Sequence, residues 1–563
     1  MNRKLSVLIA LLLALLMLSG CTAESFLGHE REKETQTQTV CFEEIEYVRP
    51  DMEQIRACVD ALNEALQSPF GFEKICECIE RFGRQYTDFE TMYALATIRS
   101  CMDVKDEYYA GEYEWCMEAD ARLQLLAEEV YSACANSKHA WWLERFMFWE
   151  GFREEYRLDE NEAPLGSYED YFSLVEREVA LLAEYRDIMA EPSIEIDGKV
   201  WDFDEYLIVD YERAYEAYYE KYNPILAKLY IELIETRRDY ARILGYDSYA
   251  DYAYAELYDR DYSPAQTVEY MGHIKRYMSA LGREINESGL EEQLMFEPVD
   301  ERELGLYLEA LAETMGGSIE QAYDFMIRYH VYDFSMSPNK ADSSFQTYLE
   351  DYNAPYIFLA PYGYTDDLLT LCHEFGHYAD SYIRQNAYES IDLSEVYSQA
   401  MQLLGAHQLE CVMTDEEHDN FVAMNLLDIL SSAQGQTALA EFELRAYEMN
   451  EPSAEKLNEL YTELLEEYGF DSGEMYREGW VDVSHLFENP LYVISYSVSA
   501  SAALQIYEKE LEEEGSGIAC FVAMSESMIS GLLEAAEYAG LNKPLSEKQV
   551  QSSAQFIRSR LMK

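Results

Sequence analysis

The residues with the clearest chemistry are His373 and His377, which stand four positions apart in the motif His-Glu-Phe-Gly-His. Residues four apart lie on the same face of an α-helix, so the two imidazoles can bind one metal ion with Glu374 beside them. Hydrolytic zinc sites use three protein ligands and leave the fourth position to water. Zinc lowers the pKa of that water from about 15.7 to roughly 7, and Glu374 is then placed to act as general base. The motif therefore predicts a hydrolytic site with one zinc ion per chain.

The third ligand must be a further side chain, and two carboxylates are available. Glu395 stands near the start of a second predicted helix, whereas Asp380 shares a helix face with His373 and His377. Glu395 also has a competing structural role, because Asp392 as N-cap and Glu395 three residues later would form a capping box. Spacing favours Glu395 and leaves Asp380 as the rival ligand.

The helix that carries the two histidines has a recognisable beginning and an apolar face. Thr365 is the predicted N-cap, and Asp366 and Asp367 complement the dipole of the first turn. The apolar stripe consists of Leu368, Leu371, Cys372 and Phe375.

The rest of the chain predicts a mainly α fold with small β elements next to the zinc helix. Helical periodicity dominates from about 46 to 190 and again from about 202 to 329. An Asp197-Gly198 pair between alternating apolar residues predicts a β-hairpin over 194–201. Residues 344–349 predict a strand. The proline-bounded run 354–361 predicts an edge strand just before the zinc helix, with an ordinary buried strand as the alternative.

Composition excludes some partners. The formal charge is −67, from 109 acidic and 42 basic residues, which argues against electrostatic binding of nucleic acid or of an anionic membrane surface. Ten cysteines remain besides Cys21, and seven of them precede residue 135. That clustering permits disulfides in an exported protein, and no spacing matches a zinc ribbon.

The N-terminus looks like a bacterial lipoprotein signal. Arg3 and Lys4 precede an apolar run that ends in Leu-Ser-Gly-Cys, with the cysteine at position 21. Cleavage before Cys21 would leave this residue as the lipid-bearing first residue of an extracytoplasmic, membrane-anchored protein. The alternative is cleavage at an ordinary signal-peptidase site, which would give a secreted protein.

The sequence resembles the thimet oligopeptidase and oligoendopeptidase F family of zinc peptidases in three segments. These are the zinc motif, the Glu-Val-Tyr-Ser segment 395–398 and a late segment with His485. The hairpin, residues 244–252 and the proline-bounded run are also similar to that family, so the resemblance covers roughly 180–510. It implies His373, His377 and Glu395 as zinc ligands, Glu374 as base, Ser398 as support for the ligand carboxylate, and His485, Tyr492 and Tyr496 as groups that bind the substrate carbonyl.

Three departures from the family pattern concern substrate contacts. Asp380 stands where many members carry a histidine. We expect its side chain to lie next to the zinc ligands. Residues 341–346 replace a glycine-rich segment, and Ser499-Ala500 stand near a common glycine position. The ligands and the base are retained, so hydrolysis is still expected.

The chain is therefore divided into a signal peptide (1–20), a polar tether (21–45), an N-terminal helical region (46–180) and a zinc peptidase region (181–563) with its catalytic core at about 330–510. The resemblance implies a large helical metallopeptidase fold with a deep substrate channel. It also implies a zinc endopeptidase that hydrolyses short unstructured peptides. The alternative is a catalytically impaired, peptidase-like lipoprotein that binds peptides without cleaving them.

Overall fold

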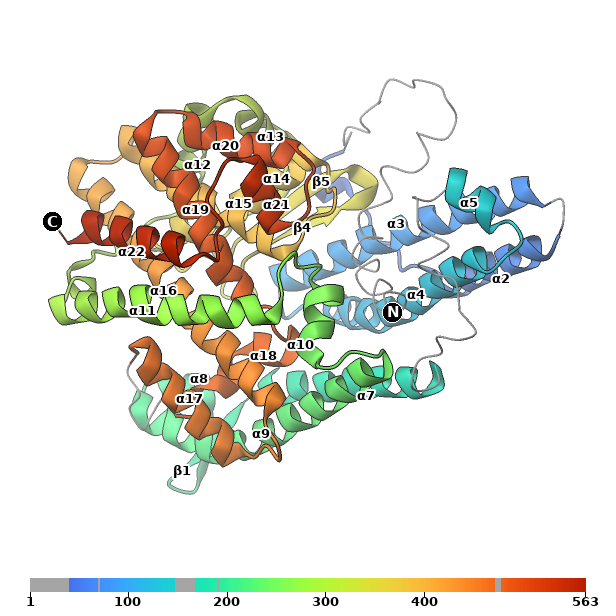
Figure 1. The fold of residues 1–563 in the computed structure, drawn as a ribbon, viewed down its shortest axis with the longest axis horizontal. Helices are drawn as coiled ribbons and strands as arrows, with labels where there is room; N and C mark the ends of the chain where they lie inside the picture. Colours follow the sequence, from blue (N-terminus) through green and yellow to red (C-terminus); the bar gives the residue numbers. More distant parts are fainter. Residues whose placement is uncertain (1–39, 69–70, 147–167, 191, 471–476, 563) are drawn as a thin grey trace.

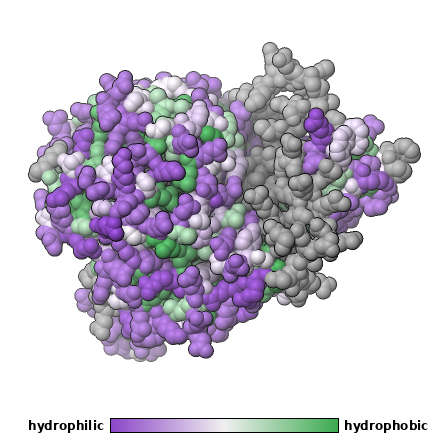
Figure 2. Space-filling view, viewed as in Figure 1, coloured by the Kyte–Doolittle hydropathy of each residue, from purple (hydrophilic) through white to green (hydrophobic). Residues whose placement is uncertain are grey.

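The computed structural model describes residues 40–68, 71–146, 168–190, 192–470 and 477–562. The signal peptide, Cys21 and most of the tether lie outside the described residues. The described chain is mainly α-helical, as predicted, with two small sheets. None of the described helices is both long and apolar enough to cross a membrane. Hydrophilic side chains cover most of the face shown in Figure 2, in keeping with the large net charge.

The N-terminal helices form a bundle with a core of its own. Its members are α2 (Met52–Gln67), α3 (Phe72–Met102), α4 (Glu107–Ala135) and the short α5 (Ala140–Phe146). The Asp51 and Asp106 carboxylates accept backbone N–H groups at the starts of α2 and α4, which satisfies donors that a helix start leaves free. Long α3 runs from this bundle to β4 (Phe345–Leu349) in the larger body, so the bundle and the larger body are packed together (Figure 1).

The larger body is built around long helices that lie on both sides of α11 (Pro264–Ser288) in Figure 1. On one side α7 (Tyr168–Ala190), α9 (Tyr211–Ile243) and α17 (Ala454–Tyr468) lie together. The other helices of the body are α8 (Phe203–Leu207), α10 (Tyr249–Tyr252), α11 (Pro264–Ser288), α12 (Glu301–Met315), α13 (Gly317–Tyr329), α14 (Asp367–Arg384), α15 (Ile391–Gln408), α16 (Asp415–Glu448), α18 (Ser484–Glu488), α19 (Ile494–Glu512), α20 (Ser516–Glu526), α21 (Leu532–Tyr538) and α22 (Glu547–Leu561).

The predicted hairpin is confirmed. Strands β1 (Ser193–Ile196) and β2 (Lys199–Asp202) pair antiparallel, with Ser193 opposite Asp202 and Ile196 opposite Lys199. Asp197 and Gly198 both have positive φ angles, 53° and 75°, as a two-residue hairpin turn of this hand requires.

The second sheet has three strands in the order β3 (Tyr332–Asp333), β5 (Ala354–Phe358), β4 (Phe345–Leu349). The strand predicted over 344–349 is confirmed as β4, which pairs antiparallel with β5. The prediction of an edge strand over 354–361 is wrong, because β5 is the central strand and all five of its residues are buried. The two-residue β3 pairs parallel with β5 on its other side, so β4 is an edge strand near the zinc helix.

Helices α14, α15 and α19 pack on one another at the centre of the body. A Cβ added at Gly376 in α14 would lie 2.6 Å from the Ser398 Cα and the Tyr397 carbonyl oxygen in α15. Such a distance is too short for real atoms, so the glycine of the His-Glu-Phe-Gly-His motif is what lets the two helix backbones approach. This close approach brings the side chains of α14 within reach of those of α15.

Candidate active site

Three side chains with metal-ligand chemistry meet between α14 and α15. His373 and His377 lie one turn apart with ring centroids separated by 5.0 Å. Their Nε2 atoms lie 3.5 Å and 3.8 Å from Glu395 Oε2. One donor atom from each residue lies within 4.8 Å of the other two, so all three can contact one ion. Glu395 points into the site and is not the partner of Asp392 in a capping box: α15 has Ser390 as its N-cap position.

The charges of this group are tightly coupled. Burial would raise the pKa of Glu395, but the hydrogen bond from His373 and the charge of His377 lower it to about 2. Burial would lower the pKa of His373, but the hydrogen bond and charge of Glu395 raise this pKa to about 9. For His377 the effect of burial is larger than that of Glu395, and its pKa is lowered to about 4. A buried carboxylate needs a positive partner, which is either the protonated His373 or a bound cation, and two nitrogens and one carboxylate oxygen are a donor set that zinc accepts. The residues present therefore fit a zinc ion.

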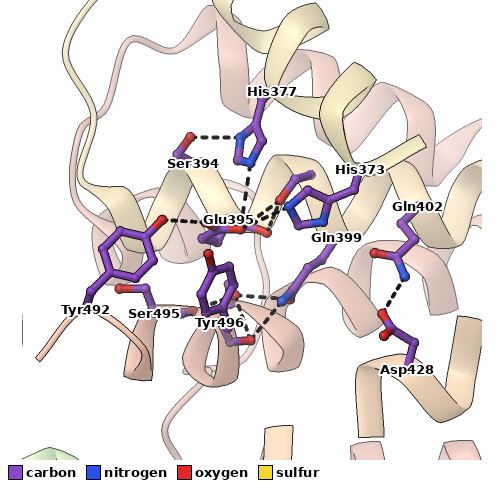
Figure 3. A network of polar contacts seen from close by, with 12 residues as sticks. His373, His377, Ser394, Glu395, Gln399, Gln402, Asp428, Tyr492, Ser495 and Tyr496 are labelled. Carbon is purple, nitrogen blue, oxygen red and sulfur yellow. Dashed lines mark hydrogen bonds and ion pairs between the residues drawn. The ribbon is translucent and has the colours of Figure 1, made fainter. Parts of the chain in front are cut away.

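Two of the three residues, His377 and Glu395, are oriented by hydrogen bonds to neighbouring hydroxyl groups (Figure 3). Ser394 Oγ lies 3.1 Å from His377 Nδ1. Ser398 Oγ donates to Glu395 Oε2 at 3.1 Å, the contact that the family resemblance implied. Tyr492 OH donates to Glu395 Oε1 at 2.8 Å. Such partners fix the direction of metal-ligating side chains and raise metal affinity.

Glu374 has the properties of a general base. Its side chain is buried next to His373 and faces a cavity of about 560 Å³. Burial raises the pKa of Glu374 to about 7, which is close to the working pH of most enzymes. A base is most effective when its pKa lies near that pH.

His485, Tyr492 and Tyr496 form an aromatic cluster beside Glu395. The ring of His485 lies 5.4 Å from that of Tyr492 and 6.1 Å from that of Tyr496, and the two tyrosine rings are 5.3 Å apart. Burial lowers the pKa of His485, which favours the neutral imidazole. The structure thus brings all three predicted residues to the same side of the ligands.

Sequence reasoning missed the residues that hold this aromatic segment in place. Arg260 is buried, pairs with Asp392 at 3.3 Å and donates to Ser495 Oγ at 2.9 Å, so it links the start of α15 to the tyrosine segment. Glu443 is also buried and accepts the backbone N–H of Leu491 at 2.7 Å, where φ is +65°. A non-glycine residue with positive φ persists only where its surroundings fix it. Neither Arg260 nor Glu443 lies in a motif that the sequence singles out.

Asp380 does not belong to the ligand group. It is buried one turn beyond His377, and its Oδ2 lies 3.9 Å from the Nε of Arg384. Glu389 is the second carboxylate beside Arg384, at 3.6 Å. The donor group at this site contains Glu395 and not Asp380, so the rival ligand is not supported, and Asp380 pairs with Arg384 instead.

The predicted N-cap Thr365 is also wrong, since α14 begins at Asp367. Thr365 instead pairs with Glu297, whose backbone N–H donates to its Oγ1 at 2.9 Å. The Asp367 carboxylate accepts the backbone N–H groups of Tyr362, Gly363 and Tyr364, and so fixes the loop that enters the helix.

Two cavities flank the ligands and meet at Asp428. The larger one, about 560 Å³, is lined by residues that include Glu374, Asp342, Asp366 and Tyr362. The smaller one, about 400 Å³, is lined by residues that include His373, Gln402 and Tyr496. Glu374 lines the larger cavity and His373 the smaller one, so open space reaches both the candidate base and one of the two histidines.

The fold is mainly helical, and its centre brings together three residues that can hold a metal ion. A model of the Peptidase M3 N-terminal domain matches residues 42–148, and a model of Peptidase family M3 matches residues 321–519. The chain belongs to peptidase family M3.

Curated relatives match over a short segment. The chain is 33% identical over 165 residues to the chromosomal oligoendopeptidase F of Lactococcus lactis subsp. cremoris, which covers 26% of this chain and 27% of that protein. It is 29% identical over 173 residues to oligopeptidase PepF of Bacillus subtilis (strain 168), covering 28% and 26% respectively. The matched segment thus spans about a quarter of the length of each relative.

Solved structures match almost throughout. A structure assigned to oligoendopeptidase F superposes with a TM-score of 0.76 at 22% identity, over 93% of this chain and 99% of that one. PZ peptidase A with an inhibitor gives a TM-score of 0.76 at 21% identity, over 92% and 99%. The fold of this chain is therefore the fold of these proteins.

Proposed function

We propose that the protein is a zinc-dependent endopeptidase that hydrolyses short, unstructured peptides. The observation that carries the proposal is the convergence of His373, His377 and Glu395 within 4.8 Å, with the buried Glu374 beside them. A zinc ion held by these three residues would supply Lewis acidity toward water and the peptide carbonyl.

The chain's own residues would carry the proton and the charge. Glu374 accepts the proton of the attacking water, and its pKa of about 7 lets it pass the proton on to the leaving amine. Neutral His485 and the Tyr496 hydroxyl are the candidates to donate to the carbonyl oxygen as it becomes negative, whereas the Tyr492 hydroxyl already donates to Glu395 Oε1. Each donor aimed at such an oxygen contributes on the order of 3 kcal/mol.

Substrate orientation would come from the edge of the small sheet. Strand β4 pairs with β5 on one side only within the described sheet, so its other edge is available to an extended peptide. Glu374 lies close to the backbone of Gln346 in β4, so a peptide on this edge would pass beside the base. Pairing of this kind needs an extended chain, which is why short unstructured peptides are the proposed substrates.

The test is cleavage of a mixed peptide library by the purified protein, followed by mass spectrometry. Glu374→Gln should lower kcat by about 10²- to 10⁴-fold while zinc remains bound, because glutamine cannot accept the proton. Glu410→Gln, an exposed change outside both cavities, is the matched control and should leave cleavage unchanged.

The outcomes separate the two functions that the sequence leaves open. Cleavage at full rate by Glu374→Gln would contradict the proposed mechanism. A wild-type protein that binds zinc and retains peptides without cleaving them would establish the peptide-binding alternative.

We also propose that the mature protein is anchored outside the cytoplasm through a lipid on Cys21. The support is the Leu-Ser-Gly-Cys sequence after the apolar run. Labelling with a radioactive fatty acid in a bacterial host should modify the wild-type chain and leave Cys21→Ala unlabelled. Release of the unlabelled wild-type protein into the medium would instead indicate secretion.

A further inference from the structure

A second group of metal-ligating side chains lies at the start of the described chain. Cys41 and Glu43 flank the buried Phe42, in and just before the 3₁₀ turn Phe42–Glu44. His330 ends α13, 287 positions further along, and its Nδ1 lies 3.1 Å from Glu43 Oε1. One donor atom each of Cys41, Glu43 and His330 lies within 4.8 Å of the other two. Ligand atoms around a tetrahedral zinc ion are about 3.3–3.8 Å apart, so a small movement of the three side chains toward one another would let them bind one ion.

The backbone on both sides of this group is already fixed. The Phe42 ring packs 4.5 Å from that of Tyr356 in β5, and Ile45 is buried. His330 adopts the left-handed conformation, with φ +54°, and its N–H closes the end of α13 on the Met326 carbonyl. The three donors are therefore presented by ordered backbone, and binding an ion would not require the segment to fold first.

The chemistry of the donors selects the kind of ion. A thiolate, an imidazole and a carboxylate together suit zinc and similar borderline metals, whereas calcium and magnesium prefer oxygen ligands alone. The Glu43 and His330 side chains are more than half exposed, at 64% and 54%, which leaves room for water as a fourth ligand. The residues differ from those between α14 and α15, so the group is independent of the proposed catalytic site.

We propose that Cys41, Glu43 and His330 form a second divalent-cation site, for zinc or a metal of similar preference. Such a site joins the N-terminal segment, which consists of Cys41 and the turn Phe42–Glu44, to the end of α13. His330 stands two residues before β3, and β3 pairs with β5. The bound ion would hold the N-terminal segment against the same sheet that packs on the helix of the two catalytic histidines.

Cobalt is a probe that tells the two sites apart. A thiolate ligand gives Co²⁺ an intense near-ultraviolet charge-transfer band, and the His373, His377 and Glu395 group contains no sulfur. Titration of the metal-free protein with Co²⁺ should produce this band in the wild type and in His377→Ala. The band should be absent in Cys41→Ser and remain in Cys411→Ser, which changes an exposed cysteine elsewhere.

A second measurement keeps the test valid if Cys41→Ser folds poorly. Zinc should slow the alkylation of Cys41 by iodoacetamide in the wild-type protein at least tenfold, as followed by peptide mass spectrometry, and leave alkylation of Cys411 unchanged. Three results would each overturn the proposal. The cobalt band could be absent from the wild type, it could survive in Cys41→Ser, or Cys41 could be alkylated at the same rate with and without zinc.

Discussion

The N-terminal bundle and the α14–α15–α19 core are both helical, but they bury different kinds of side chain. The core of the bundle consists of apolar residues such as Ile55, Leu62 and Leu123. The catalytic core buries Glu374, Glu395, Arg260 and Asp392 among its apolar residues. Burial of a charge is costly unless it is paired, so each charge in the catalytic core depends on a particular partner. The bundle is held mainly by buried apolar area and has few buried charges, such as Glu112, whereas the catalytic core contains several buried charges that are held by specific pairs.

The largest effect is expected from breaking one of these pairs. Arg260→Met removes the partner of Asp392 and the donor to Ser495. An uncompensated buried charge costs about 3–5 kcal/mol, so the urea midpoint should fall, and kcat should fall as the tyrosine segment loosens. The double variant Arg260→Met with Asp392→Asn should recover part of the stability. If it is no more stable than Arg260→Met, Asp392 is not the group left unpaired.

A cavity in the bundle should affect stability alone. Leu62 is fully buried in α2, and Leu62→Ala should lower the free energy of unfolding by about 2–5 kcal/mol. Because the bundle core contains none of the candidate catalytic residues, kcat/KM per folded molecule should stay at the wild-type value. A lower kcat/KM in the folded fraction would show that the two regions are coupled more closely than this comparison implies.

A smaller effect is expected from the loss of one hydrogen bond that orients a zinc ligand. Ser398→Ala removes the hydrogen bond to Glu395 Oε2, and zinc affinity should fall by about 10- to 100-fold. Competition with a chelator of known affinity measures the change. Ser559→Ala, an exposed serine on α22, is the control and should keep wild-type affinity.

The smallest effect is a pH dependence within the bundle. Burial raises the pKa of Glu128 in α4 from 4.5 to about 8. The folded protein therefore binds this proton more tightly than the unfolded chain, so the contribution of Glu128 to stability falls as pH rises from about 4.5 to about 8. Glu128→Gln should raise the urea midpoint at pH 8 and leave it unchanged at pH 4. The exposed Glu118→Gln on the same helix should change neither.

The parts of the molecule that the sequence could predict are those set by local patterns. The helices, the Asp197-Gly198 hairpin and the histidine pair follow from spacing and turn chemistry within a few residues. The role of β5 could not be read locally, because its second neighbour β3 is only two residues long and precedes β4. Asp392 looked like an N-cap, and only Arg260, 132 positions away, shows why it is buried instead. Long-range pairs of this kind leave no local signal.

The central assignment is Glu395 as the third zinc ligand, and its most direct test compares Glu395→Ala with Asp380→Ala. Zinc dissociation constants of both variants are measured by chelator competition in a Cys41→Ser background, so that only the site between α14 and α15 is counted. Glu395→Ala should weaken zinc binding far beyond the roughly tenfold to hundredfold effect of losing a supporting residue. Asp380→Ala should stay near the background value. Tight zinc binding by Glu395→Ala, with loss of zinc in Asp380→Ala, would contradict the assignment.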